Sequence, residues 1–174
     1  MKTNRILKLI TLSAAIFGFA ATSFAQSSSS ASAEATIITP ITIANDVDMN
    51  FGNVAVQAST AGTVVLTPAG GRTATDGVTL PATTGTVAAA KFTVSGEPNY
   101  TYVLTLPAAS INVTSGSNTM PVGTWTSSLN GANGTLSAGG SASFTVGATL
   151  SVAAGQATGT YSNATGFEVT VNYN

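Results

Sequence analysis

Apolar and polar residues alternate over much of this chain, most clearly at residues 144–152, where every second side chain is apolar. Residues 100–106 and 167–173 repeat the pattern with aromatic residues among the apolar ones. A two-residue period is typical of strands that bury one face. The same criteria predict further strands at residues 35–44, 47–56, 63–67, 77–80, 87–95, 111–113 and 120–129, and a short one around Tyr161.

Turn-forming residues separate the predicted strands. Residues 68–71 read Pro-Ala-Gly-Gly, and Asn130-Gly131 and Asn133-Gly134 are dipeptides that favour two-residue hairpin turns. Beyond the first 25 residues, no stretch shows the period of an amphipathic helix. Strands that recur at roughly 8–12-residue spacing predict an all-β, immunoglobulin-like antiparallel sandwich.

Pro40 lies inside the first predicted strand. A proline has no backbone N–H to donate to a neighbouring strand. Residues 35–44 are therefore expected either at the edge of a sheet or interrupted at Pro40.

The N-terminal residues have the order of a secretory signal peptide. Lys2, Arg5 and Lys8 provide positive charge, an apolar stretch follows, and the small residues Ser23 and Ala25 suit a cleavage site after Ala25. We therefore expect export from the cytoplasm and no membrane span in the mature chain. The predicted parts are a cleaved signal peptide at 1–25, a flexible polar lead at 26–34 and a single sandwich domain at 35–174.

Removal of the signal peptide leaves a sparsely charged, acidic chain. Only Arg72 and Lys91 remain against six Asp and Glu residues, so the net charge becomes −4. Two basic residues cannot neutralise a row of phosphates, which argues against a nucleic-acid partner. The chain has no cysteine, so stability must come from packing and strand pairing without disulfides.

The residue types needed for common catalytic sites are scarce. With no His and no Cys, neither a Ser-His-Asp triad nor a Cys-His dyad can form. A Ser–Lys pair would have to use Lys91, which alternates with Phe92 and is expected to face solvent. A glycosidase would need two of the six carboxylates to converge in a cleft. We expect no enzyme activity and no cofactor.

Asp46, Asp48 and Asn50 are the only candidate cation ligands. Their D-x-D-x-N spacing resembles the start of a calcium loop. Phe51 then stands where such a loop has glycine, and Gln57 stands where it has glutamate. The favoured interpretation places the three side chains on the outer face of a strand, with no metal bound.

Several motifs in a fixed order resemble the bacterial domain-of-unknown-function family 4402. They read P-I-T-I at 40–43, D-x-N-F-G-N-V at 48–54, F-T-V-S-G-x-P at 92–98 and G-T-Y followed by V-T-V-N-Y at 159–173. The resemblance covers about residues 35–174. It implies a secreted envelope protein similar in layout to spore-coat-U-type and archaic chaperone–usher pilin domains, with no biochemical activity to carry over.

The pilin resemblance implies that the sandwich lacks one strand, which the N-terminal extension of the next subunit supplies by β-augmentation. Tyr173 matches the tyrosine near the pilin C-terminus that lies on the strand paired with a periplasmic chaperone. In the alternative arrangement, residues 35–43 pair within their own chain and close the sandwich. The assembly-strand candidates are Ala31, Ala33, Ala35 and Ile37 in the donor and Phe167, Val169, Val171 and Tyr173 in the acceptor.

The sequence therefore favours a structural or adhesive surface subunit of fimbrial type. Its expected partners are copies of itself or related subunits and a periplasmic chaperone. The alternative function is a stand-alone, monomeric binding module. Both functions place the chain outside the cytoplasm of a Gram-negative-type bacterium, in the periplasm, on the cell surface or in the medium.

Overall fold

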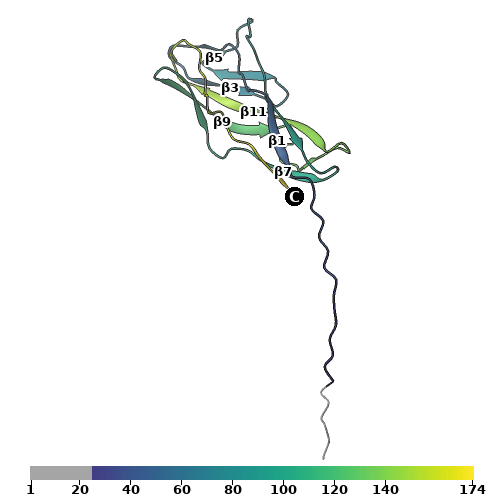
Figure 1. Ribbon diagram of the computed structural model, residues 1–174. Coiled ribbons are helices and arrows are strands. Elements are labelled where there is room, and N and C mark those ends of the chain that lie inside the picture. The colour runs from purple at the N-terminus through teal and green to yellow at the C-terminus, as the bar shows by residue number, and fades with distance from the viewer. Residues whose placement is uncertain (1–24) are drawn as a thin grey trace, which may run out of the picture. The chain divides into compact units, whose positions relative to one another are not determined.

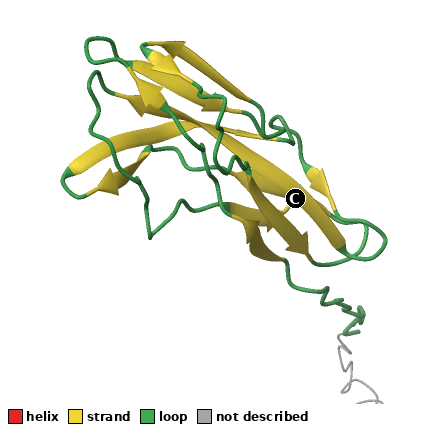
Figure 2. Ribbon diagram, turned by 90° about the horizontal axis from the view of Figure 1, so that it is seen from above, coloured by secondary structure: helices red, strands yellow, loops and turns green. Residues whose placement is uncertain are grey.

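The long strand β11 (Ser141–Val152) lies in the middle of the larger sheet, between β3 and β9 (Figure 1). The structure is a computed structural model that describes residues 25–174, and its regular elements in that range are all strands (Figure 2). The predicted alternation is confirmed along β11, because its core-facing side chains are at most 4 % exposed. These are Phe144, Val146, Ala148, Leu150 and Val152.

The larger sheet is antiparallel and seven-stranded, in the order β1-β6-β11-β3-β4, with β9 also paired to β11 and β8 to β9. The bounds of these strands are β1 Thr42–Val47, β3 Gly62–Leu66, β4 Arg72–Asp76, β6 Ala90–Ser95, β8 Ile111–Ser115 and β9 Asn118–Ser127.

Strand β11 changes partner along one of its edges. Its first half pairs with β6 and its second half with β3, while β9 lies along the other edge. Gly147 marks the change of partner, and a side chain there would overlap the carbonyl of Leu66 and the start of the turn after β3. The absence of a side chain lets the chain leaving β3 approach β11 closely.

A smaller sheet, in the order β10-β7-β12, packs against part of the larger one. Its strands are β10 Gly134–Thr135, β7 Thr101–Thr105 and β12 Thr170–Tyr173, and a separate pair joins β2 Ala55–Val56 to β5 Val78–Thr79. One apolar cluster lies between the two sheets and includes Phe92, Phe144, Tyr102 and Val171. The predicted antiparallel sandwich is thus confirmed.

A second apolar cluster lies at the other end of β11, around Val64, Val122 and Leu150. Met49 and Trp125 pack against both clusters. The two clusters are therefore linked, and β11 contributes side chains to each.

The expectation for Pro40 is confirmed, but the first strand is displaced from the predicted residues 35–44. Strand β1 starts only after Pro40, at Thr42, and forms an edge of the larger sheet. Val47 ends β1, and residues 48–56 form no strand apart from a bridge between Asn50 and Ala88 and the short β2. A register shift between Asn45 and Val47 ends the regular pairing with β6 and leaves Val47 41 % exposed.

The turn predicted at Asn130-Gly131 forms, but it does not connect the two strands of a hairpin. Asn130 and Gly131 do adopt positive φ angles of 49° and 79°, but the chain here passes from β9 in the larger sheet to β10 in the smaller one. The two-residue hairpin lies instead between β8 and β9, around Gly116. Strand β4, which forms a hairpin with β3 around the predicted turn at residues 68–71, has no clear signal in the sequence.

The closing strand is shorter than predicted. Strand β12 begins at Thr170, which pairs with Thr105, and continuing that register would place residue 168 opposite Pro107. Pro107 has no N–H, so the ladder stops there. The strand expected around Tyr161 is only an isolated bridge between Ser162 and Thr114.

Residues 25–36 form a unit separate from residues 37–174 and contain no strand or helix. The predicted signal peptide at 1–25 lies almost entirely outside the described residues. No helix in the described range is long and apolar enough to cross a membrane.

Gly147→Ala should destabilise the sandwich by about 1–3 kcal/mol, the usual cost of overpacking, because the new Cβ would overlap backbone atoms that cannot rotate away. Gly139→Ala is the matched control, since its Cβ would meet no atom closer than Ser137 Oγ, at 3.7 Å. Urea unfolding of both variants measures the difference. Equal stability of the two variants would contradict the role assigned to Gly147.

Candidate functional site

Strands β1 and β12 lie next to each other, and β12 carries two of the predicted acceptor residues, Val171 and Tyr173. Strand β1 is an edge of the larger sheet, β12 is an edge of the smaller one, and the two strands are in contact. No backbone hydrogen bond joins β1 to β12 among the described residues. We call this border between β1 and β12, extended by residues 167–169, the seam.

Strand β12 uses only one of its edges. Its four residues pair with β7, and the described part of the chain places no strand on the opposite side. Residues 167–169 precede β12 and belong to no strand. Backbone N–H and C=O groups along the seam therefore remain available to a further strand.

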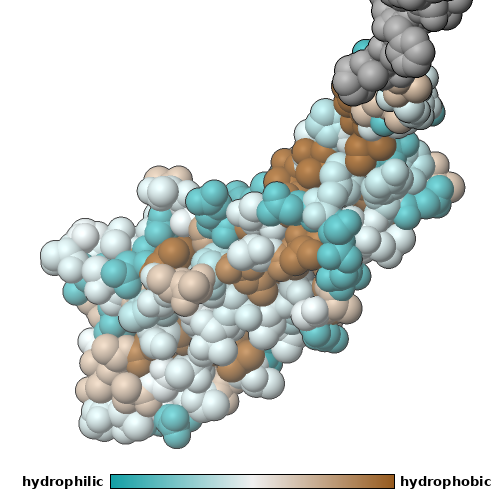
Figure 3. All heavy atoms as spheres, turned by 90° about the horizontal axis from the view of Figure 1, so that it is seen from below, coloured by the Kyte–Doolittle hydropathy of each residue, from teal (hydrophilic) through white to brown (hydrophobic). Residues whose placement is uncertain are grey.

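Apolar side chains on both borders of the seam pack against the core but are only partly buried. Val171 is the exception on β12, with 8 % exposure. Apolar residues also gather in a broken row on the face of the sandwich seen in Figure 3. The partly buried residues of the seam are Ile41, Ile43 and Met49 on one side and Phe167, Val169 and Tyr173 on the other.

Aromatic rings fill the space beneath residues 167–169. The Phe167 ring lies 4.5 Å from the Trp125 ring and 6.1 Å from the Phe92 ring, measured between centroids. Phe92 in turn stacks on Phe144 at 5.4 Å. These contacts hold Phe167 against the larger sheet although its backbone has no ladder partner, so the acceptor border is ordered by side-chain packing.

Two other sheet edges, those of β8 and β4, have contacts with neighbouring segments. Thr114 of β8 exchanges two backbone hydrogen bonds with Ser162, and Asn163 Nδ2 donates to the carbonyl of Asn112. Beside β4, the guanidinium of Arg72 donates to the carbonyls of Phe51 and Asn53. Folded proteins commonly protect edges in this way, whereas no strand within residues 25–174 pairs with the outer edge of β12.

Three residues far apart in the sequence close one end of the seam. The Tyr173 hydroxyl donates to the carbonyl of Thr39 at 2.7 Å and accepts the N–H of Glu97 at 2.6 Å. The Glu97 carboxylate accepts the N–H of Thr39 at 2.9 Å. We call this arrangement of Thr39, Glu97 and Tyr173 the latch, and it holds both backbone polar groups of Thr39.

Gly96 and Tyr100 accommodate the Tyr173 side chain of the latch. A side chain at Gly96 would overlap the Tyr173 hydroxyl, so glycine is needed there. The Tyr100 ring packs edge-on against the Tyr173 ring at 5.7 Å. Hydrogen bonds from the backbone and side chain of Thr39 lower the pKa of Glu97 below its ordinary value, because they favour the ionised carboxylate.

The proposed donor residues belong to no strand. Ala31, Ala33 and Ala35 are exposed and belong to the unit at residues 25–36, which has no regular structure. Ile37 begins the other unit and is 96 % exposed. The structure thus brings the acceptor residues together at the seam and leaves the donor residues without a strand partner in the described range.

The candidate cation ligands are engaged in three separate local contacts. Asp46 accepts a hydrogen bond from the Thr93 hydroxyl at 2.6 Å, Asp48 accepts one from Asn45, and the Asn50 side chain accepts the N–H of Gly52. Within residues 25–174, no group of three or more His, Cys, Asp or Glu residues could hold a metal ion.

The remaining charged side chains do not gather in one place. Lys91 is exposed on β6, as its alternation with Phe92 predicts. Glu97 follows the strand that pairs with the start of β11, whereas Asp76 pairs with Gly62 near the end of β11. These two carboxylates therefore lie at opposite ends of the long strand.

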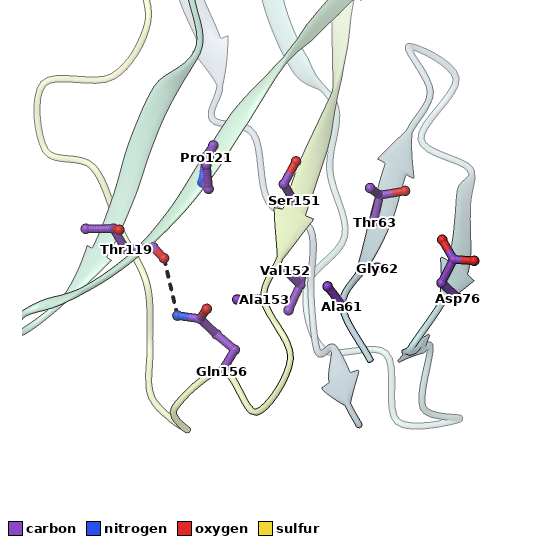
Figure 4. Close-up of a pocket in the computed structure, with 10 residues that line it drawn as sticks. All are labelled: Ala61, Gly62, Thr63, Asp76, Thr119, Pro121, Ser151, Val152, Ala153 and Gln156. Carbon is purple, nitrogen blue, oxygen red and sulfur yellow. Dashed lines mark hydrogen bonds between the residues drawn. The ribbon is translucent and has the colours of Figure 1, made fainter. Parts of the chain in front are cut away.

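Asp76 borders an open depression of about 470 Å³ near the end of β11. Figure 4 shows Thr63, Ser151 and Asp76 along neighbouring strands, and Gln156 Nε2 donating to the carbonyl of Thr119. Asp76 has a φ angle of 53°, a left-handed conformation uncommon for residues other than glycine. The depression offers a carboxylate and several hydroxyls to a ligand.

Sequence reasoning identified Tyr173 but missed both of its partners. Thr39 and Glu97 are separated from Tyr173 by 134 and 76 residues, and neither lies in a motif that points to the other. Pro98 marked Glu97 only as part of a turn. The contact depends on how the sheets fold together, which no local pattern encodes.

Acid should weaken the latch through Glu97. Because its folded-state pKa is lowered, its stabilising effect is complete above the unfolded value of about 4.3 and is lost as the pH falls through the lower folded value. Urea midpoints should therefore show wild type more stable than Glu97→Gln at neutral pH, with the gap closing in acid. Glu168→Gln, at an exposed site, is the control. A gap that does not change with pH would contradict this prediction.

The whole sandwich, including both borders of the seam, falls within one family match. Residues 41–173 match the family described as domain of unknown function DUF4402. No curated protein and no solved structure matches the chain. Since the match covers most of the 174 residues, the chain belongs to the DUF4402 family.

Proposed function

We propose that the chain is a non-enzymatic structural subunit of the bacterial cell surface, of the fimbrial, pilin-like type, that assembles by strand addition. The free edge of β12 carries this proposal. Beside that edge, half-buried apolar side chains lie on both borders of the seam. A strand added there would gain backbone hydrogen bonds and cover apolar surface at once.

Residues 26–37, called the lead from here on, are the segment that supports strand addition between copies. Ala31, Ala33, Ala35 and Ile37 alternate with polar residues, so an extended lead presents one apolar face. Export by the N-terminal signal peptide would bring the chain to the periplasm, where a chaperone could cover the seam until assembly. Adhesion would then be a property of the assembled fibre.

Small side chains in the lead suit the seam, because aromatic side chains of the same domain already occupy much of the space beneath it. Phe167 occupies the space between Trp125 and Phe92, so an added strand has little room to insert large residues. The added strand would be held mainly by backbone hydrogen bonds and by contacts of its alanine side chains. This explains how a lead with three alanines and one isoleucine could serve.

A stand-alone binding module is the second candidate function. Strand β1 pairs with β6 of its own chain, and the depression beside Asp76 offers polar groups to a ligand. A monomer with an uncovered β12 would favour this function.

Deletion of residues 26–37 should convert assemblies of the exported protein into monomers, because it removes the donor segment. Ala33→Asp should have the same effect, since it places a charge on the apolar face of the lead. Ser32→Asp is the matched control, because it faces the other way and should leave assembly intact. Light scattering measures the solution mass. A wild-type protein that is already a folded monomer would rule out strand addition and favour the binding module.

A further inference from the structure

The latch lies where a chain would have to turn in order to complete its own sandwich. Strand β1 begins at the same end of the sandwich at which β12 ends, because Thr42 pairs with Ser95 while Tyr173 bonds to the nearby Glu97. A lead that filled its own seam would run beside β12 and then reverse into β1. That reversal would have to occur at Thr39 and Pro40.

The hydrogen bonds of the latch are incompatible with such a reversal. The N–H of Thr39 is taken by the Glu97 carboxylate and its carbonyl by the Tyr173 hydroxyl. Pro40 has no N–H and a fixed φ angle, so it cannot supply the hydrogen bond of a tight hairpin. Ile37, two residues before Thr39, is 96 % exposed and so is not inserted in the seam of its own chain.

We propose that the latch formed by Thr39, Glu97 and Tyr173 keeps each chain from filling its own seam and so reserves the lead for a second copy. This inference rests on the proposed strand addition and adds the residues that give it direction. Glu97 and Tyr173 act as positioning residues, because they touch Thr39 and not the donor residues. The exposed Ile37 is then the largest apolar anchor offered to the next copy.

Cross-linking within and between chains tests this proposal. The chain has no cysteine, so Ala33→Cys and Val169→Cys can be combined in the full sequence without competing thiols. A short bismaleimide joins the lead to the acceptor border even if the exact register between them is unknown. A link within one chain gives a monomer of altered mobility on a denaturing gel, and links between chains give a ladder.

With the latch intact we expect the ladder. Adding Tyr173→Phe should raise the within-chain product relative to the ladder by about tenfold, as expected for the loss of one such hydrogen-bonding group. Tyr100→Phe is the matched control, because its ring touches Tyr173 but its hydroxyl makes no hydrogen bond within the described residues. Glu97→Ala provides a second test of the latch if Tyr173→Phe folds poorly.

The outcomes separate the two proposals. A ladder that is equally strong with and without the latch would overturn the role of the latch and leave strand addition standing. A parent protein that forms no ladder would overturn strand addition, and the latch proposal would fall with it. A shift of the same size in Tyr100→Phe would show that the effect is not specific to the Tyr173 hydroxyl and would overturn the role of the latch.

Discussion

The backbone pairing of β11 is the constraint on which the rest of the sandwich depends. This one strand forms ladders with β6, β3 and β9, and its side chains enter both apolar clusters. A chain without cysteine has no disulfide to hold these strands together, so cooperative pairing and burial must do so. Gly147 lets two partners share one edge, since only a bare backbone allows the chain leaving β3 to approach so closely.

The same arrangement places the edge strand β1 next to the free edge of β12. Because β6 and β3 occupy one edge of β11, β1 becomes the outermost strand beyond β6, and it faces β12 of the smaller sheet. The edges of β8 and β4 are covered by loop segments and by Arg72, whereas the free edge of β12 is not. An open edge beside half-buried apolar residues is costly for an isolated protein, which is why assembly is the favoured explanation.

Most polar side chains that suggested chemistry serve the fold instead. Asp46 binds the Thr93 hydroxyl, Asn50 caps a local turn at Gly52, and Glu97 holds Thr39. Glu97 and Asp76 lie at opposite ends of β11, too far apart for the paired carboxylates of a glycosidase. Four of the charged side chains, Asp46, Asp48, Arg72 and Glu97, thus hold loops and the entry of the chain into β1.

The sequence by itself determined the fold class, because the two-residue apolar period of β11, β7 and β12 is local and states which face of each strand is buried. Through the pilin resemblance and the alternation of small apolar residues in the lead, it also predicted that Tyr173 and the lead take part in assembly. The sequence did not determine which strands pair. For this reason Asn130-Gly131 was predicted to form a hairpin, and the last strand was predicted to begin at residue 167, although Pro107 ends the ladder before that position. Only the tertiary structure decided that β12 keeps a free edge and that Thr39, Glu97 and Tyr173 meet. Their hydrogen bonds join residues 58 to 134 positions apart, so they depend on how the two sheets pack and cannot be predicted from local periodicity.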